Sequence, residues 1–143
     1  YGIEPLQENW TWENFLSILK KQPNVKIKAF LLNQKYISGL GNIYTDESCF
    51  CAGIFQGRLV KSLKKNELKD LFNCIQKIII KALESKGTTF RDYRTVSGEK
   101  GNFSEQLLVF ERKGSLCSRC QKGIIEKTRL AGRGTYFCPN CQK

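Results

Sequence analysis

Four of the seven cysteines form two close pairs near the C-terminus: Cys117 with Cys120, and Cys138 with Cys141. The spacing C-x2-C-x17-C-x2-C is typical of structural zinc sites, in which four thiolates surround one ion tetrahedrally. Four protein ligands leave no open position for water or substrate, so the pattern predicts one structural Zn²⁺ and not a catalytic one. Zinc binding would also supply the folding free energy that a short tail with few apolar residues lacks.

The residues between the two pairs predict a β-hairpin whose turn carries an arginine. Residues 124–129 and 135–137 are the expected strands, and residues 131–134 are the expected turn. Arg133 stands between two glycines, so we expect its guanidinium to lie at the tip of the hairpin with little steric cover. A guanidinium can donate two parallel hydrogen bonds to a phosphate group. An ordinary exposed turn arginine is the alternative, and residue chemistry alone weighs the two evenly.

A second anion-binding pattern is the sequence GLGN at residues 39–42. Its glycines precede the expected start of a helix, where backbone N–H groups without intrahelical partners attract anions. Asn42 adds a side-chain amide donor, and Tyr44 adds a hydroxyl in the first turn. A simple helix cap is the alternative. Beside the basic hairpin, this pattern suggests two contacts with the phosphates of one duplex.

The net charge of the chain points to an acidic partner. The chain has 143 residues, with 24 lysines and arginines against 13 acidic residues, and a formal net charge of +11. Residues 112–143 hold eight basic residues and one acidic residue, so positive charge is densest beside the cysteine pairs. Nucleic acid, an acidic membrane surface and an acidic protein are the partner classes that such a charge allows.

Missing residue types and patterns exclude several functions. The chain has no histidine, which excludes Ser-His-Asp and Cys-His nucleophile systems, a histidine base and imidazole zinc ligands. No apolar run approaches the ~20 residues of a membrane span, and no secretory signal is present, so we expect a soluble intracellular protein. The odd cysteine count also argues against disulfides, so Cys49, Cys51 and Cys74 are expected to be buried free thiols.

Apolar periodicity and capping residues predict mainly helical structure before the cysteine pairs. Thr11 is the expected N-cap of the first helix, with Trp10 and Phe15 packed across its start. The apolar stripe is strongest over residues 66–85, and Gly87 is expected to end that helix. The expected elements are helices over residues 12–21, 26–33, 42–53 and 66–85, a long loop over 87–103 and a short strand over 106–111.

Three segments resemble bacterial formamidopyrimidine-DNA glycosylase: residues 34–54, 87–103 and 117–143. They occur in the order found in that family, and the similarity extends over essentially the whole chain. The first segment resembles the family's helix–two-turns–helix motif, and the last resembles its zinc-finger hairpin. The resemblance implies a mainly α-helical helix–two-turns–helix domain over residues 1–108, followed by a small zinc-bound β-hairpin finger over residues 109–143.

The same resemblance implies a base-excision repair enzyme for double-stranded DNA with an oxidised base or an abasic site. The family flips out oxidised purines such as 8-oxoguanine, cleaves the glycosidic bond and nicks the strand by β- and δ-elimination. Its nucleophile, an amino-terminal proline, and the glutamate after it belong to an N-terminal β-sandwich domain that this chain does not contain. The chain is therefore expected to be the DNA-binding half, inactive alone, of a monomeric, cytoplasmic bacterial enzyme associated with the nucleoid.

Individual residues also acquire roles through the resemblance. Asn42 matches the family's phosphate-binding asparagine, and Arg133 matches an arginine that grips phosphates beside the lesion and donates a proton in δ-elimination. Lys127 matches a DNA-contacting lysine, and Lys21 and Lys28 are weaker candidates for a backbone contact. The residues expected in the loop that covers the everted base are Thr88, Phe90, Arg91, Asp92 and Tyr93, with Asp92 where a small hydroxylated residue is expected.

Two alternatives stay open at this point. One is an endonuclease VIII-like glycosylase for oxidised pyrimidines, and the other is a non-enzymatic, zinc-stabilised module that binds damaged DNA. The uninterrupted loop over 87–103 and the sequence GLGNIYTDES at 39–48 favour the purine-specific branch.

Overall fold

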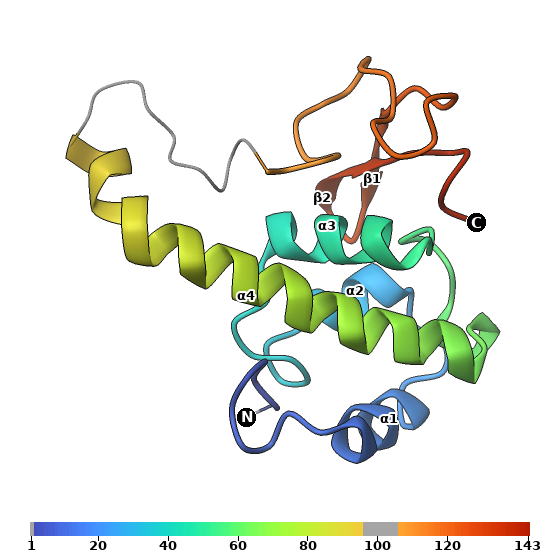
Figure 1. Cartoon of the computed structure of the whole chain (residues 1–143). Helices are drawn as coiled ribbons and strands as arrows, with labels where there is room; N and C mark the ends of the chain where they lie inside the picture. The colour runs from blue at the N-terminus through green and yellow to red at the C-terminus, as the bar shows by residue number, and fades with distance from the viewer. Residues whose placement is uncertain (1, 96–105) are drawn as a thin grey trace.

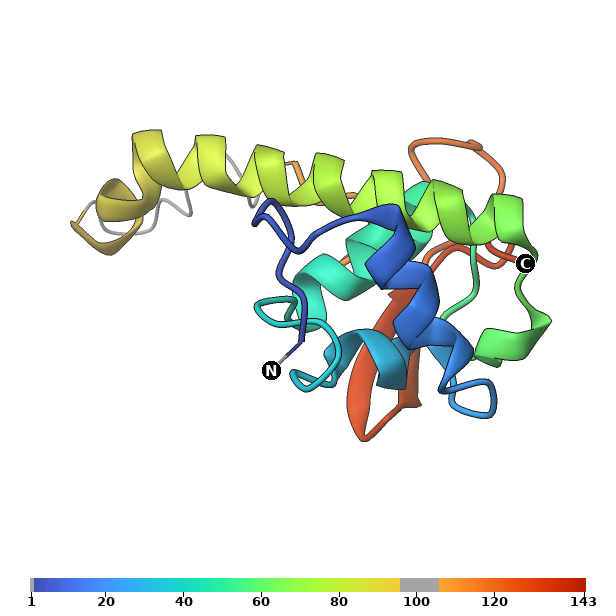
Figure 2. The same ribbon diagram turned by 90° about the horizontal axis from the view of Figure 1, so that it is seen from below.

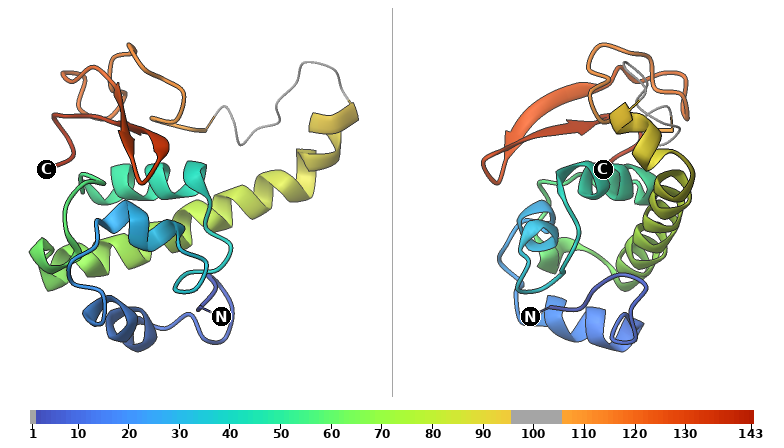
Figure 3. Two further views of the ribbon diagram at one scale, coloured as in Figure 1. Left: turned by 180° about the vertical axis from the view of Figure 1, so that it is seen from behind. Right: turned by 90° about the vertical axis from the view of Figure 1, so that its left-hand side faces the viewer.

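A computed structural model describes residues 2–95 and 106–143, with side chains described outside residues 86–95. Helix α3 lies at the centre, with the hairpin on one side and α2 and α4 on the other (Figures 1 and 3). None of the described helices has both the length and the apolar character that a membrane crossing needs. The described elements are α1 (Trp12–Lys20), α2 (Ile27–Leu32), α3 (Asn42–Ala52), the 3-10 helix η1 (Val60–Ser62), α4 (Lys65–Thr95), β1 (Glu126–Leu130) and β2 (Arg133–Phe137).

Helix α1 begins as the sequence predicts. The Thr11 side chain accepts a hydrogen bond from the Asn14 backbone N–H at 3.1 Å, which satisfies a donor that the first turn leaves unpaired. The rings of Trp10 and Phe15 lie 5.4 Å apart across this cap, as a hydrophobic staple requires. The helix ends at Lys20, before the proline at position 23.

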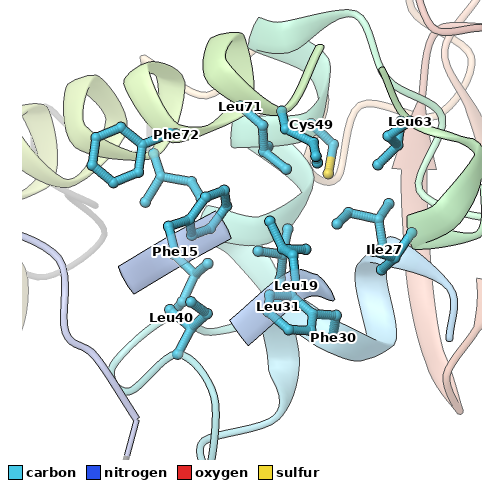
Figure 4. Close-up of a cluster of buried hydrophobic side chains, with 14 of the residues drawn as sticks. Phe15, Leu19, Ile27, Phe30, Leu31, Leu40, Cys49, Leu63, Leu71 and Phe72 are labelled. Carbon is cyan, nitrogen blue, oxygen red and sulfur yellow. The ribbon is translucent and has the colours of Figure 1, made fainter. Parts of the chain in front are cut away.

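The main core lies where the four helices meet (Figure 4). Trp10 stacks on Phe72 with ring centroids 4.7 Å apart, and Phe15 packs edge-on against Trp10 and at a tilt against Phe72. A second, smaller cluster joins the finger to α3 through Phe50, which is buried against Val109, Cys117, Ile125 and Cys138. The finger is therefore packed onto the helical part and is not a freely tethered module.

Helix α4 is longer than expected. It continues through Gly87 to Thr95, so the predicted loop over 87–103 is helical over 87–95, and its C-terminal turns extend past the other elements (Figure 2). A single glycine inside a helix costs only about 1 kcal/mol relative to alanine, which a long, cooperatively formed helix can absorb. The expected base-capping residues 88–93 thus belong to α4, where their side chains lie outside the described part, as do residues 96–103.

The strand predicted over residues 106–111 is not formed. These residues make turns instead, and the Glu47 carboxylate accepts hydrogen bonds of 2.9 Å from the backbone N–H groups of Leu108, Val109 and Phe110. An isolated strand would have left these donors unpaired, whereas a buried carboxylate on α3 satisfies all three.

Two of the three cysteines outside the zinc pattern are linked. Cys51 at the end of α3 and Cys74 on α4 form a disulfide with Cα atoms 5.8 Å apart, so the prediction of free thiols is wrong for this pair. The prediction holds for Cys49, which is free and fully buried. Spacing along the chain could not indicate the link, because it depends on how α3 and α4 face one another.

Arg58 connects the C-terminal residue of the chain to the start of α4. Its guanidinium donates to both carboxylate oxygens of Glu67, at 2.7 and 3.1 Å, and to the backbone oxygens of Ser62 and Lys143. The hydrogen bonds from Arg58 lower the pKa of Glu67 below its ordinary 4.5.

We expect Glu67→Gln to reduce the free energy of unfolding at pH 7 by about 0.5–1 kcal/mol, since the pair is partly exposed. A carboxyl whose pKa is lowered by folding stabilises the fold above its unfolded pKa and loses this contribution as the pH falls through the folded value. Urea unfolding at pH 7 and at increasingly acid pH should show the two proteins converging below pH 4.5. A difference that persists in acid would contradict this role.

Candidate nucleic-acid interface

The four paired cysteines converge as zinc ligands do. Their Sγ atoms all lie within 4.8 Å of one another, and the Cys117–Cys141 and Cys120–Cys138 distances are both 3.8 Å. Four sulfur atoms about 2.3 Å from a tetrahedral zinc ion lie roughly 3.8 Å apart, so the donor set fits this ion. Cys117 and Cys138 are buried in the smaller core cluster. The zinc site is thus built into the contact between the finger and α3.

The hairpin is tighter than the sequence suggested. Strands β1 and β2 are joined by the two residues Ala131 and Gly132, both with positive φ (53° and 72°), as a type I′ turn requires. Arg133 is therefore not at the tip but is the first residue of β2, opposite Leu130. Side chains alternate along a strand, so Arg133 shares a face with the buried Thr135, the face turned toward the helices.

Lys28 is the main correction to the predicted DNA contacts. Its side chain is fully buried, and its Nζ donates to Asp46 Oδ1 at 2.9 Å, to the Gly134 carbonyl at 3.0 Å and to Thr135 Oγ1 at 2.7 Å. An ammonium has three N–H donors, and here all three are used within the protein. Lys28 thus has no donor left for a phosphate, and it joins α2 to α3 and β2.

The environment of this ion pair shifts the pKa values of both partners. Burial lowers the pKa of the Lys28 ammonium, and the nearby Arg133 charge lowers it further, while the Asp46 carboxylate opposes both effects. Burial raises the pKa of Asp46, and hydrogen bonds from Lys28, Gln56 and the Tyr136 N–H favour its charged form.

Asn42 meets the hairpin at the same carbonyl as Lys28. It is the first residue of α3, and its Nδ2 donates to the Gly134 carbonyl at 3.1 Å, while its Oδ1 is buried without a hydrogen-bond partner. The start of α3 and the residue after Arg133 are therefore in direct contact. The two predicted phosphate-binding features, 91 positions apart in the sequence, lie side by side.

The other predicted contacts are not gathered at this point. Tyr44 lines a pocket of about 250 Å³ with Leu6 and Leu83, away from the hairpin. Lys127 is exposed on β1, where its ammonium lies 5.4 Å from the ring centre of Tyr136, and the strand register puts it on the face opposite to Arg133. Lys21 is exposed at the C-terminal end of α1.

Sequence reasoning missed a buried polar network beneath the hairpin. Gln56 Nε2 donates to Asp46 Oδ1 at 3.1 Å and to the Tyr136 carbonyl at 2.8 Å, and the Tyr136 N–H donates to Asp46 Oδ2 at 3.0 Å. Gln142 extends the network to Gln56 and to the Ile54 carbonyl. The one signal in the sequence was the run of polar residues Thr45–Ser48, one turn after Asn42. All four of these residues are buried, because other elements cover α3 on both sides.

Comparison with known proteins agrees with this arrangement. Residues 1–94 match the family described as the formamidopyrimidine-DNA glycosylase H2TH domain, and residues 123–143 match the zinc finger found in FPG and IleRS. The chain belongs to the formamidopyrimidine-DNA glycosylase family. The predicted fold, a helix–two-turns–helix part with a zinc-finger hairpin, and the predicted structural Zn²⁺ with four cysteine ligands are thereby confirmed.

Relatives and solved structures in the formamidopyrimidine-DNA glycosylase family match nearly the whole chain. The enzymes of Prochlorococcus marinus (strain MIT 9312) and Carboxydothermus hydrogenoformans are 44% and 43% identical over 99% of it, which is 48% and 53% of those proteins. Lactococcus lactis Fpg in complex with abasic-site DNA superposes with a TM-score of 0.85 at 36% identity, covering 99% of this chain and 51% of that one. MutM in complex with DNA that contains carbocyclic 8-oxo-G superposes with a TM-score of 0.85 at 37% identity, with the same coverage of both chains. The chain therefore spans about half the length of the curated relatives it matches.

Proposed function

We propose that this chain is the DNA-binding half of a base-excision repair glycosylase and AP lyase for oxidised purines. Its target would be duplex DNA with 8-oxoguanine, a formamidopyrimidine or an abasic site, in the bacterial nucleoid. Family membership supports the proposal, as do related structures that hold DNA containing an abasic site, 8-oxo-G or FAPY-dG. We place the division between helical part and finger at residues 108 and 109. The proline nucleophile and its glutamate would come from the remaining half, so this chain alone would be inactive.

The observation that carries the proposal is the contact at the Gly134 carbonyl. Lys28 and Asn42 both donate to this atom, at 3.0 and 3.1 Å, and so hold Arg133 beside the N-terminus of α3. The backbone N–H groups of that helix end, where the N-cap side chain makes no hydrogen bond, would then form one group of phosphate donors with the Asn42 amide and the exposed Arg133 guanidinium. Such contacts fix the backbone without reading sequence, which suits an enzyme that must hold a strand while one nucleotide is flipped out.

Within this proposal, Arg133 also serves as the proton donor in δ-elimination. Lys127 and Lys21, both exposed, would contact the backbone farther from the lesion. Tyr44 lies on another side of α3 from the hairpin, so we expect it not to share a phosphate with Asn42. We also propose, from the family resemblance, that Thr88, Phe90, Arg91, Asp92 and Tyr93 contact the everted base.

Arg133→Ala should weaken binding to a duplex with a central abasic-site analogue by about ten- to a hundred-fold, since a hydrogen bond to a charged group is worth roughly 1.5–3 kcal/mol. Losing one phosphate contact should also reduce the slope of log K against log salt by about 1. Fluorescence anisotropy at several salt concentrations measures both quantities.

Arg129→Ala is the matched control. It removes the same charge from the same hairpin, but the register puts Arg129 on the face opposite to Arg133. We expect its affinity to change by less than about threefold, since distant exposed charges are screened. Equal losses in the two variants, with circular dichroism unchanged, would reduce the role of Arg133 to general charge and overturn its assignment.

A further inference from the structure

The disulfide between α3 and α4 serves no purpose in the proposed DNA contact. Cys51 lies in the last turn of α3, and Cys74 lies on the facing side of α4, with Cα atoms 5.8 Å apart. This separation falls inside the range of about 4.4–6.8 Å that a disulfide spans without backbone movement. The fold therefore places two cysteines outside the zinc site at a separation that allows a disulfide.

Cys51 is the more accessible member of the pair. Cys74 is 6% exposed, whereas the half-buried Cys51 lines a pocket of about 330 Å³. Phe50 and Ile78 form apolar walls of this pocket. Its charged lining residues are Lys77, Lys81, Arg119 and Glu47, and the Glu47 carboxylate already accepts hydrogen bonds from three backbone N–H groups. A pocket with this lining suits a small anionic molecule, and Cys51 is the sulfur it would reach first.

We propose that Cys51 and Cys74 form a reversible modification site, a dithiol that a small anionic disulfide such as glutathione disulfide oxidises. The Cys51 thiolate attacks one sulfur of glutathione disulfide, forms a mixed disulfide and releases one glutathione thiolate. The Cys74 thiolate then attacks the Cys51 sulfur, closes the internal disulfide and releases the second glutathione. The protein loses two electrons and two protons, and glutathione disulfide gains them as two molecules of glutathione.

The cross-link acts on the helix that supports the finger. Arg119, which lies between Cys117 and Cys120, donates to the backbone oxygens of Phe50 and Cys51. Its guanidinium lies 3.8 Å from the centre of the Phe50 ring. Fixing the end of α3 against α4 therefore also fixes the attachment point of the finger. Asn42 lies at the opposite end of α3, so oxidation should change stability and leave DNA affinity unchanged.

Peptide mapping of the zinc-saturated 143-residue chain tests the proposal. After equilibration with reduced or oxidised glutathione and blocking with N-ethylmaleimide, trypsin releases Cys51 in peptide 36–58 and Cys74 in peptide 70–77. We expect the two peptides to be joined in the oxidised sample and separate in the reduced one. Because Cys49 shares peptide 36–58, Cys49→Ala should keep the link, and Cys51→Ala should abolish it.

Thermal unfolding supplies the second readout. Closing a loop of 23 residues should raise the Tm of the oxidised chain by about 5–10 °C, in the wild type and in Cys49→Ala but not in Cys51→Ala or Cys74→Ala. Affinity for abasic-site DNA should differ by less than about twofold between redox states, and zinc content should not change. The proposal fails if both cysteines remain alkylated in oxidised glutathione, if Cys49 is the linked residue, or if the Tm shift survives in Cys51→Ala.

Discussion

Cys138→Ser, or chelation of zinc, should unfold the finger and abolish specific binding to damaged DNA while the helical core stays folded. Zinc binding contributes roughly 10–16 kcal/mol in small zinc modules, as much as the whole stability of an ordinary domain. Two ligands, Cys117 and Cys138, are also buried members of the cluster that packs on Phe50, so the metal site and this contact should be lost together. Arg133 would then be detached from α3, which is why binding should fall to the nonspecific level.

The chain contains its own reporters for this experiment. Both tryptophans, Trp10 and Trp12, pack with Phe15 and Phe72 in the helical core, so their fluorescence follows that core and not the finger. We expect the fluorescence transition in urea to survive chelation, with amide protection lost over residues 107–143. Ser118→Ala, an exposed change between the first two ligands, serves as the control. Loss of the tryptophan transition on chelation would show that the two parts fold as one unit and contradict the prediction.

Lys28→Met should reduce the free energy of unfolding by about 3–5 kcal/mol. The change leaves the Asp46 carboxylate buried without its cation, and an uncompensated buried charge costs this much in other proteins. The Gly134 carbonyl and Thr135 would lose a donor at the same time. Chemical denaturation measures the loss, and DNA affinity should fall with it because β2 loses two of its hydrogen bonds to the helical part.

Two variants make this prediction specific. Lys26→Met removes an exposed lysine two residues earlier and should change stability by less than about 0.5 kcal/mol. Lys28→Met combined with Asp46→Asn removes both charges and should recover a substantial part of the loss. If Lys28→Met unfolds at the wild-type denaturant concentration, the buried ion pair does not hold the hairpin.

Local patterns in the sequence were sufficient for the features that depend on neighbouring residues. The cap at Thr11, the helix start at Asn42 and the convergence of the four zinc ligands follow from spacing along a short stretch of chain. The hairpin was also predictable, although its two-residue turn shifted Arg133 from the tip into β2. In each case the physical constraint acts over one or two turns of backbone.

Features that depend on distant contacts were not predictable in this way. Lys28 looked like a free cation because its partners Gly134 and Thr135 lie 106 and 107 residues away. The same limitation applies to the Cys51–Cys74 disulfide. It also applies to Glu47, whose carboxylate binds backbone N–H groups in the segment predicted to be a strand. The prediction that Gly87 ends the helix was wrong for a different reason. A glycine costs about 1 kcal/mol in a helix, which is small compared with the free energy gained by extending a long helix such as α4 cooperatively.

The doubly hydrogen-bonded carbonyl of Gly134 has a consequence for how tightly DNA can be held. Because Lys28 secures this oxygen on its own, Asn42 can exchange its hydrogen bond for a phosphate oxygen without leaving the carbonyl unpaired. In the proposed phosphate site, the start of α3 and the backbone next to Arg133 would thus already be in place in the free protein. The loss of conformational entropy on binding would then be small, and a larger share of the contact free energy would contribute to affinity.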